Sequence, residues 1–89
     1  MDEELRLAKE NDKGVRAEVL LKDEIFREAI DTLKKTYTEE MFKTKFSEEQ
    51  KRLSLLVHFN TLESIEKHIK DVINTGKLAN EQLKQLKKI

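Results

Sequence analysis

The spacing of apolar residues predicts a chain built from helices. Between about residues 23 and 44, apolar side chains recur every three or four positions, which is the period of one helix face. The members of this stripe are Phe26, Ala29, Ile30, Leu33, Tyr37 and Met41. Asp23 precedes the stripe and is a suitable N-cap, because its carboxylate can accept hydrogen bonds from the first amides of a helix. The pattern therefore predicts an amphipathic helix over about 23–44.

The next stretch, about residues 47–75, carries the most apolar surface. Its first residues, Ser47-Glu48-Glu49-Gln50, have the sequence of a capping box and predict a helix that begins at Ser47. Two series spaced by seven form a heptad seam widened by Phe59 and Ile73: Leu55, Leu62 and Ile69, and His58, Ile65 and Val72. A further group lies on the other side of the same helix: Leu53, Leu56 and Val57. A hairpin with the preceding helix can cover only one of these two sides.

The two glycines are predicted to interrupt helices near both ends of the chain. Gly14 closes the turn-favouring segment Asn11-Asp12-Lys13-Gly14, so we expect a short helix over about 15–21, with residues 1–14 as a candidate flexible arm. Gly76 suits the left-handed position that ends a helix. Asn80 would then begin a short last helix, with one side formed by Leu83, Leu86 and Ile89.

Together these elements predict an all-α fold in a single domain, residues 1–89. An antiparallel helical hairpin of about 23–44 and 47–75 is joined by a short N-terminal helix and a short C-terminal helix. Apolar residues make up 37% of the chain and charged residues 40%, which leaves little core for a monomer of 89 residues. We therefore expect the protein to oligomerise, and we predict its protein interface at Leu53, Leu55, Leu56, Val57, His58, Phe59, Leu62, Ile65, Ile69 and Val72.

Composition and motifs argue against an enzyme. The chain has no cysteine for a disulfide or a thiolate nucleophile, and neither histidine is preceded three residues earlier by a glutamate, as di-iron helical bundles require. No glycine-rich phosphate loop or nucleophile elbow occurs. We predict no catalytic residue, no metal and no cofactor. His58 is expected to be a half-buried histidine bonded to a neighbour, with a role in setting the helix pairing as the alternative.

Charge and hydropathy bear on partners and location. The net charge is zero, which gives no bulk attraction to nucleic acid or to a membrane. No apolar run approaches the roughly 18 residues of a membrane span, and the acidic start is unlike a signal peptide, so a cytoplasmic location is expected. Four lysines near the end could contact phosphates: Lys77, Lys84, Lys87 and Lys88. The simpler interpretation is that they stabilise the C-terminal end of a helix.

Several segments carry a similarity to a known group of proteins. They are Arg16 to Ala29, Tyr37 with Thr44, Gln50 to Leu53, and Asn74 to Ala79. In this order they resemble short helical proteins of tailed bacteriophages that are often encoded near head and packaging genes and mostly have no assigned function. The similarity covers about Arg16 to Leu83. It implies a viral accessory or assembly protein, located in the host cytoplasm or in the virion, and it transfers no catalytic residue.

The functional prediction combines this resemblance with the surplus of apolar faces. We predict a non-enzymatic phage helical protein that self-associates or binds a phage or host protein, and that serves virion assembly or DNA packaging. A nucleic-acid-binding accessory protein that uses the C-terminal lysines is one alternative. An inhibitor that lays a helix into a groove of a host protein is another.

Overall fold

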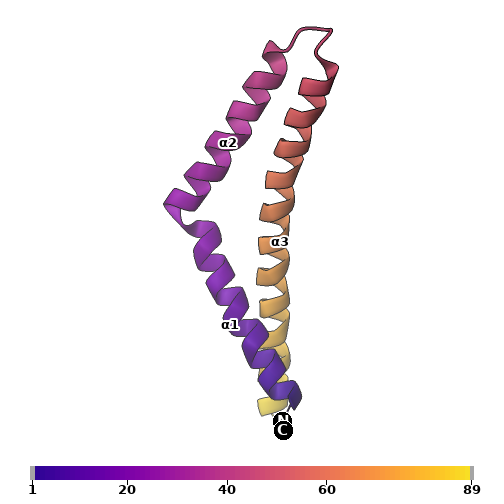
Figure 1. The fold of residues 1–89 in the computed structure, drawn as a ribbon. Helices are drawn as coiled ribbons and strands as arrows, with labels where there is room; N and C mark the ends of the chain where they lie inside the picture. The colour runs from indigo at the N-terminus through magenta and orange to yellow at the C-terminus, as the bar shows by residue number, and fades with distance from the viewer. Residues whose placement is uncertain (1, 89) are drawn as a thin grey trace. The chain divides into compact units, whose positions relative to one another are not determined.

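The computed structural model describes residues 2–88, which form three α-helices (Figure 1). Helix α1 spans Asp2–Lys22, α2 spans Glu24–Lys43 and α3 spans Glu49–Lys87. No strand occurs between residues 2 and 88, and the predicted all-α class is confirmed. Within that range, none of the helices combines the length and the apolarity needed to cross a lipid bilayer.

A single residue, Asp23, separates α1 from α2. Its backbone is extended, with φ −61° and ψ 128°, and its carboxylate accepts a hydrogen bond of 2.8 Å from the amide of Phe26. The side chain thus satisfies one of the amides that have no partner at the start of a helix. This confirms Asp23 as the N-cap of α2.

Residues 44–48 connect α2 to α3. Helix α2 ends at Lys43 and has Thr44 as its C-cap, whose hydroxyl donates a hydrogen bond of 2.7 Å to the carbonyl of Met41. Helix α3 begins at Glu49, so the predicted start at Ser47 is wrong. The physical reason is that Glu48 turns back and accepts a hydrogen bond of 2.8 Å from the amide of Lys45, which places Ser47 in the turn.

Arg52, in the first turn of α3, closes this connection. One guanidinium nitrogen donates to the hydroxyl of Thr44 at 3.0 Å and to the carbonyl of Lys45 at 2.8 Å. The other donates to the carbonyl of Phe46 at 3.4 Å. Because these acceptors belong to three successive residues, one side chain holds most of the turn in place.

Both glycines lie inside helices, contrary to the prediction from the sequence. Helix α1 runs unbroken through Asn11–Gly14, and α3 continues through Gly76 to Lys87. The predicted short N-terminal helix and the separate short C-terminal helix are therefore wrong. Residues 2–14, predicted as a candidate arm, belong to α1 and include the buried Leu7. Ile89, predicted for the last helix, lies outside the described residues.

The helices form two compact units, and α3 contributes to both. Unit 1 consists of Met1–Lys22 and Lys67–Ile89, and unit 2 consists of Asp23–Glu66. Unit 1 therefore joins segments from both ends of the sequence, whereas unit 2 is one continuous segment. Each unit has two helical layers.

Unit 1 is organised around a close contact between α1 and α3 at Gly14 and Gly76, both of which are buried. A Cβ atom on either glycine would lie only 2.8 Å from the Cα of the other, well inside the roughly 3.5–4.0 Å at which carbon atoms pack. The absence of side chains lets the two backbones touch. This contact explains why two poor helix formers lie in helix interiors. The buried apolar residues of this unit are Leu7, Ile73 and Ala79.

In unit 2, α2 and α3 run antiparallel. Later residues of α2 contact earlier residues of α3: Lys34 reaches Glu66, Tyr37 meets His58, and Thr44 bonds Arg52. Ile30 is the buried apolar residue of this unit. The core of unit 2 is therefore small, and most of its apolar side chains are half-buried or exposed.

Candidate interaction surfaces

The inward stripe of α3 differs from the predicted seam by one residue in every heptad. A series of positions that are buried or half-buried alternates in steps of three and four, with the buried Ala79 beside it: Leu55, Phe59, Leu62, Glu66, Ile69, Ile73, Gly76, Asn80 and Leu83. Phe59, Glu66 and Ile73 thus occupy the positions assigned from the sequence to His58, Ile65 and Val72. Helix α3 therefore has two neighbouring stripes that carry apolar residues. The stripe through Phe59 and Ile73 points inward, and the stripe through His58 and Ile65 is exposed beside it.

The ten residues predicted as an interface therefore divide into two groups. Half-buried members lie on or beside the inward stripe: Leu55, Phe59, Leu62, Ile69 and Val72. Exposed members are Leu53, Leu56, Val57, His58 and Ile65. Only the second group is available to another molecule without opening the fold.

His58 does not have the environment predicted for it. The residue is exposed, and its ring meets the ring of Tyr37 edge-on, with 5.4 Å between ring centroids. It is therefore neither half-buried nor a member of the inward stripe. The cause is the register of α3, which brings Phe59 inward and leaves His58 at the edge of unit 2.

Exposed apolar side chains outnumber buried ones in the described part of the chain. Four hydrophobic residues are buried, whereas fourteen large ones are exposed. Phe42 and Phe46, which lie at the end of α2 and in the turn, are 86% and 99% exposed. The turn beside them is closed by hydrogen bonds that Arg52 donates to the carbonyls of Lys45 and Phe46.

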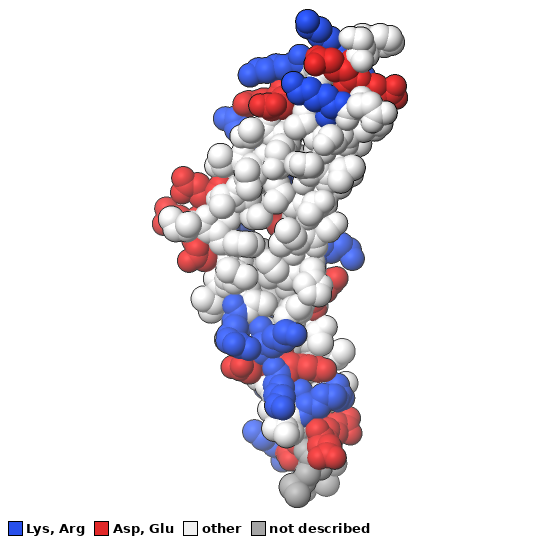
Figure 2. All heavy atoms as spheres, viewed as in Figure 1, with Lys and Arg blue, Asp and Glu red and all other residues white. Residues whose placement is uncertain are grey.

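One side of unit 2 carries a group of eight uncharged residues over about three helical turns, and Glu28 lies at its border in a shallow groove that four of them also line. Its eight members are all exposed, and we call them the uncharged face: Ile25, Ala29, Thr32, Leu33 and Thr36 from α2, and His58, Thr61 and Ile65 from α3. Helical spacing places each set on one flank of its helix, and the contact of Tyr37 with His58 joins the two flanks. Figure 2 shows a broad area without charge over α2 and the first half of α3.

The opposite edge of unit 2 carries charges that are paired within the chain. Lys34 donates a hydrogen bond of 2.9 Å to Glu66, lies 3.8 Å from Glu63 and stands 5.5 Å from the ring centre of Phe59. The hydrogen bond to Glu66 and the nearby carboxylates raise the pKa of Lys34. This pairing allows Glu66 to occupy a half-buried position in the inward stripe.

A second exposed apolar group lies toward the turn of unit 2. We call it the turn cluster, and it consists of Phe42, Phe46, Leu53, Leu56 and Val57. All five are exposed, so the turn cluster adds to the apolar surface that unit 2 leaves in water.

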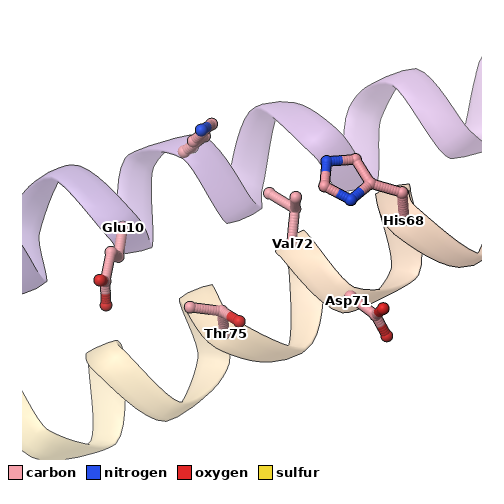
Figure 3. Close-up of a pocket in the computed structure, with 6 residues that line it drawn as sticks. Glu10, His68, Asp71, Val72 and Thr75 are labelled. Carbon is pink, nitrogen blue, oxygen red and sulfur yellow. The ribbon is translucent and has the colours of Figure 1, made fainter.

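A shallow groove of about 260 Å³ lies between α1 and α3 in unit 1 (Figure 3). Glu10 and Lys13 line it from α1, and His68, Asp71, Val72 and Thr75 line it from α3. The close-up shows the ring of His68 toward α1 and the carboxylate of Asp71 directed away from it. Among residues 2–88, no three or more His, Cys, Asp or Glu side chains are placed to hold a metal ion. The groove therefore presents no group that indicates chemistry.

The four lysines predicted as phosphate contacts are all exposed. Lys77 and Lys84 continue a row that begins at Lys70, and its members are spaced seven positions apart, so the row follows one edge of α3. Acidic neighbours reduce its charge, because Lys84 lies 3.6 Å from Glu81. Lys77 also faces α1, where a groove of about 380 Å³ contains Lys22 and Glu18 beside it.

Glu18 is the acidic partner within that groove. Lys22 donates a hydrogen bond of 2.8 Å to its carboxylate. This hydrogen bond and the charges of Lys22 and Lys77 lower the pKa of Glu18. Part of the positive charge at this edge is therefore already compensated within unit 1.

Comparison of the chain with protein-family models, with curated proteins and with solved structures finds no match. No functional residue is therefore transferred from another protein.

Proposed function

We propose that this chain is a non-enzymatic assembly protein that works by associating with further copies of itself. The observation that carries the proposal is that, among residues 2–88, four hydrophobic residues are buried whereas fourteen large hydrophobic residues are exposed. Covering apolar surface contributes roughly 25 cal/mol per Å². Exposed apolar patches beyond the scattered residues of an ordinary surface are typical of proteins that bind other proteins.

The resemblance to short tailed-phage proteins supports a role in virion assembly or DNA packaging. In such a role, a small helical protein contributes contacts and shape, and catalysis is not required. The protein would act in the host cytoplasm or remain in the virion. Its self-associating surfaces would join copies to one another during particle assembly.

Size-exclusion chromatography coupled to light scattering tests the proposal directly. We expect a mass above 10.5 kDa that rises with protein concentration, because association follows mass action. Far-ultraviolet circular dichroism of the same samples establishes that the helices are formed. A fully helical protein that stays at the monomer mass over a hundredfold concentration range would contradict self-association.

The lysine row favours one second candidate, a nucleic-acid-binding accessory protein. Phosphate contacts of this kind give an affinity that falls steeply with salt. Fluorescence anisotropy with labelled duplex DNA at low and moderate salt measures it, with Lys70, Lys77 and Lys84 changed together to Gln as the test variant and Lys35→Gln as the control. Absence of binding at low salt would remove this candidate.

A further inference from the structure

We propose that the connection between α2 and α3 is a contact site for single-stranded nucleic acid. The site consists of two aromatic rings and the two lysines that lie between them in the sequence, and we call it the tip site: Phe42, Lys43, Lys45 and Phe46. The connection projects beyond the two helices that it joins (Figure 1). The proposal goes beyond self-association, and its residues are separate from the lysine row of α3.

The two rings of the tip site are open to water. Phe42 is 86% exposed and Phe46 is 99% exposed, and both lysines are exposed as well. Phenylalanine is among the residues most often found inside proteins, so two open rings within one short connection call for a partner. Nearly all of each ring is accessible to a flat molecule that stacks on it.

The backbone that carries the tip site is held in place. The guanidinium of Arg52 donates hydrogen bonds to the hydroxyl of Thr44 and to the carbonyls of Lys45 and Phe46. The amide of Lys45 donates a hydrogen bond of 2.8 Å to the carboxylate of Glu48. A ligand therefore meets a connection that is already ordered, and binding does not have to fix its backbone.

The charge of the connection is complementary to phosphate. Residues 42–52 contain four basic and two acidic residues, a net charge of +2. Glu39 and Glu40 precede this segment on α2 and offset its charge at longer range. The positive charge is thus local to the tip site, and we expect an affinity that depends on stacking and is measurable at low salt.

The order of rings and cations favours nucleic acid over other partners. Aromatic rings stack on any base, and lysines between them can pair with the phosphates that link the bases. A protein interface would have to remove water from Lys43 and Lys45, and an anionic lipid surface would repel the neighbouring Glu48 and Glu49. The bases of a duplex are already stacked on one another, so the tip site should prefer single strands.

Nuclear magnetic resonance of the ¹⁵N-labelled full chain can locate the contact. In a titration with a short oligothymidylate at low salt, we expect amide shift changes to concentrate in residues 42–51 and to be small in residues 70–84. The logarithm of the binding constant should fall with the logarithm of salt concentration with a slope of about −1.4, because two phosphate contacts contribute about −0.7 each.

Alanine substitutions test the stacking. Phe42→Ala and Phe46→Ala should each weaken binding of the oligothymidylate by about fivefold or more, the effect typical of a lost base–aromatic stack. The matched control is Leu53→Ala, which shortens an exposed aliphatic side chain of the turn cluster and should change binding by less than about twofold. All three side chains are exposed, so circular dichroism should show unchanged helical content.

Glutamine substitutions test the phosphate contacts. The double variant of Lys43→Gln and Lys45→Gln should bind more weakly than wild type and lose most of the salt dependence. Lys35→Gln, which removes an exposed lysine of α2 outside the tip site, is the control and should keep both the affinity and the slope.

Four results would overturn the proposal. Shift changes confined to residues 70–84 would assign binding to the lysine row. Equal effects of Leu53→Ala and Phe46→Ala would indicate a general apolar contact without stacking. Binding to phosphatidylglycerol vesicles, with none to the oligothymidylate, would assign the tip site to a lipid surface. A chain that oligomerises in light scattering but shows no shift changes at low salt would reject the tip site alone, whereas a monomer that binds the oligothymidylate as described would support it and contradict self-association.

Discussion

Replacing either glycine of unit 1 with alanine is expected to destabilise the protein, although the same change stabilises an isolated helix. In a solvated helix interior, alanine is favoured over glycine by about 1 kcal/mol. Here a methyl group on Gly14 would lie 2.8 Å from the Cα of Gly76 and 3.2 Å from the carbonyl oxygen of Val72. On Gly76 it would lie 2.8 Å from the Cα of Gly14 and 2.9 Å from the carbonyl oxygen of Glu10. These neighbours are backbone atoms, so the helices themselves must move.

The size of the effect follows from these distances. Carbon atoms pack at about 3.5–4.0 Å, so α1 and α3 must separate by roughly 0.7 Å or more at this point. Overpacking of this kind costs about 1–3 kcal/mol. Subtracting the gain in helix propensity leaves a net loss of about 0–2 kcal/mol. Gly76→Ala is expected at the upper end, because its methyl group would meet two backbone atoms closer than 3.0 Å.

Urea unfolding followed by far-ultraviolet circular dichroism measures the free energy of unfolding. All variants are compared at one protein concentration, because self-association adds to apparent stability. Ser64→Ala, at an exposed position of α3, is the control and should be neutral or slightly stabilising. The double glycine variant should lose less than the sum of the single losses, since both methyl groups occupy one contact. A gain of about 1 kcal/mol in either single variant would refute the close helix contact.

Three further predictions concern single side chains. Asp23→Ala removes the acceptor for the Phe26 amide and should lower the free energy of unfolding by about 1 kcal/mol. Asp23→Asn keeps an acceptor and should stay close to wild type. If urea unfolding shows the same loss of stability for both variants, Asp23 does not act as the cap. Arg52→Lys removes the guanidinium that donates hydrogen bonds to Thr44 and to the carbonyl of Lys45, and it should accelerate amide hydrogen exchange in residues 44–48. Unchanged exchange would show that the turn is stable without these hydrogen bonds. The raised pKa of Lys34 means that its pairing stabilises the fold below the ordinary lysine pKa of 10.5 and is lost as pH rises through the higher folded value. Wild type should therefore lose stability more steeply than Lys34→Met in alkaline urea titrations, and parallel losses would contradict the pairing.

Structural features that depend on near neighbours could be predicted from the sequence. The N-cap at Asp23 and the end of α2 next to Thr44 involve groups three residues away or fewer. The glycines could not be predicted in the same way. Their local preference for turns is overridden by a contact between positions 62 residues apart, Gly14 and Gly76. The role of each glycine, which is to let the backbones of α1 and α3 touch, becomes visible only when both helices are in place.

The register of α3 also depends on a distant residue. The spacing of apolar residues in α3 is compatible with two choices of inward stripe. One runs through His58 and Ile65, and the other runs through Phe59 and Glu66. The second stripe points inward in the structure. There Glu66 accepts a hydrogen bond from Lys34 of α2, which lies 32 positions earlier in the sequence. Helical periodicity cannot predict such a pairing, because a glutamate on an isolated helix favours solvent.

The candidate surface was predicted in part. His58 and Ile65 were among the interface residues, but the α2 half of the uncharged face was missed because Leu33 and Ala29 were assigned to a packed stripe. A usable signal was present in the sequence. Positions 25, 29, 32, 33 and 36 lie on one flank of α2 and none of them is charged, in a chain of which 40% is charged.

The way unit 1 joins distant parts of the sequence has a consequence for the order of folding. The contact of Thr44 with Arg52 closes a loop of eight residues, whereas Gly14 and Gly76 are 62 residues apart. Loop-closure entropy makes the longer closure cost about 1.8 kcal/mol more when it is made first. Contacts of unit 2 should therefore form early and shorten the remaining loop. During synthesis, α1 emerges before α2 and α3, yet it must wait for residues 67–87 before it can bury Leu7.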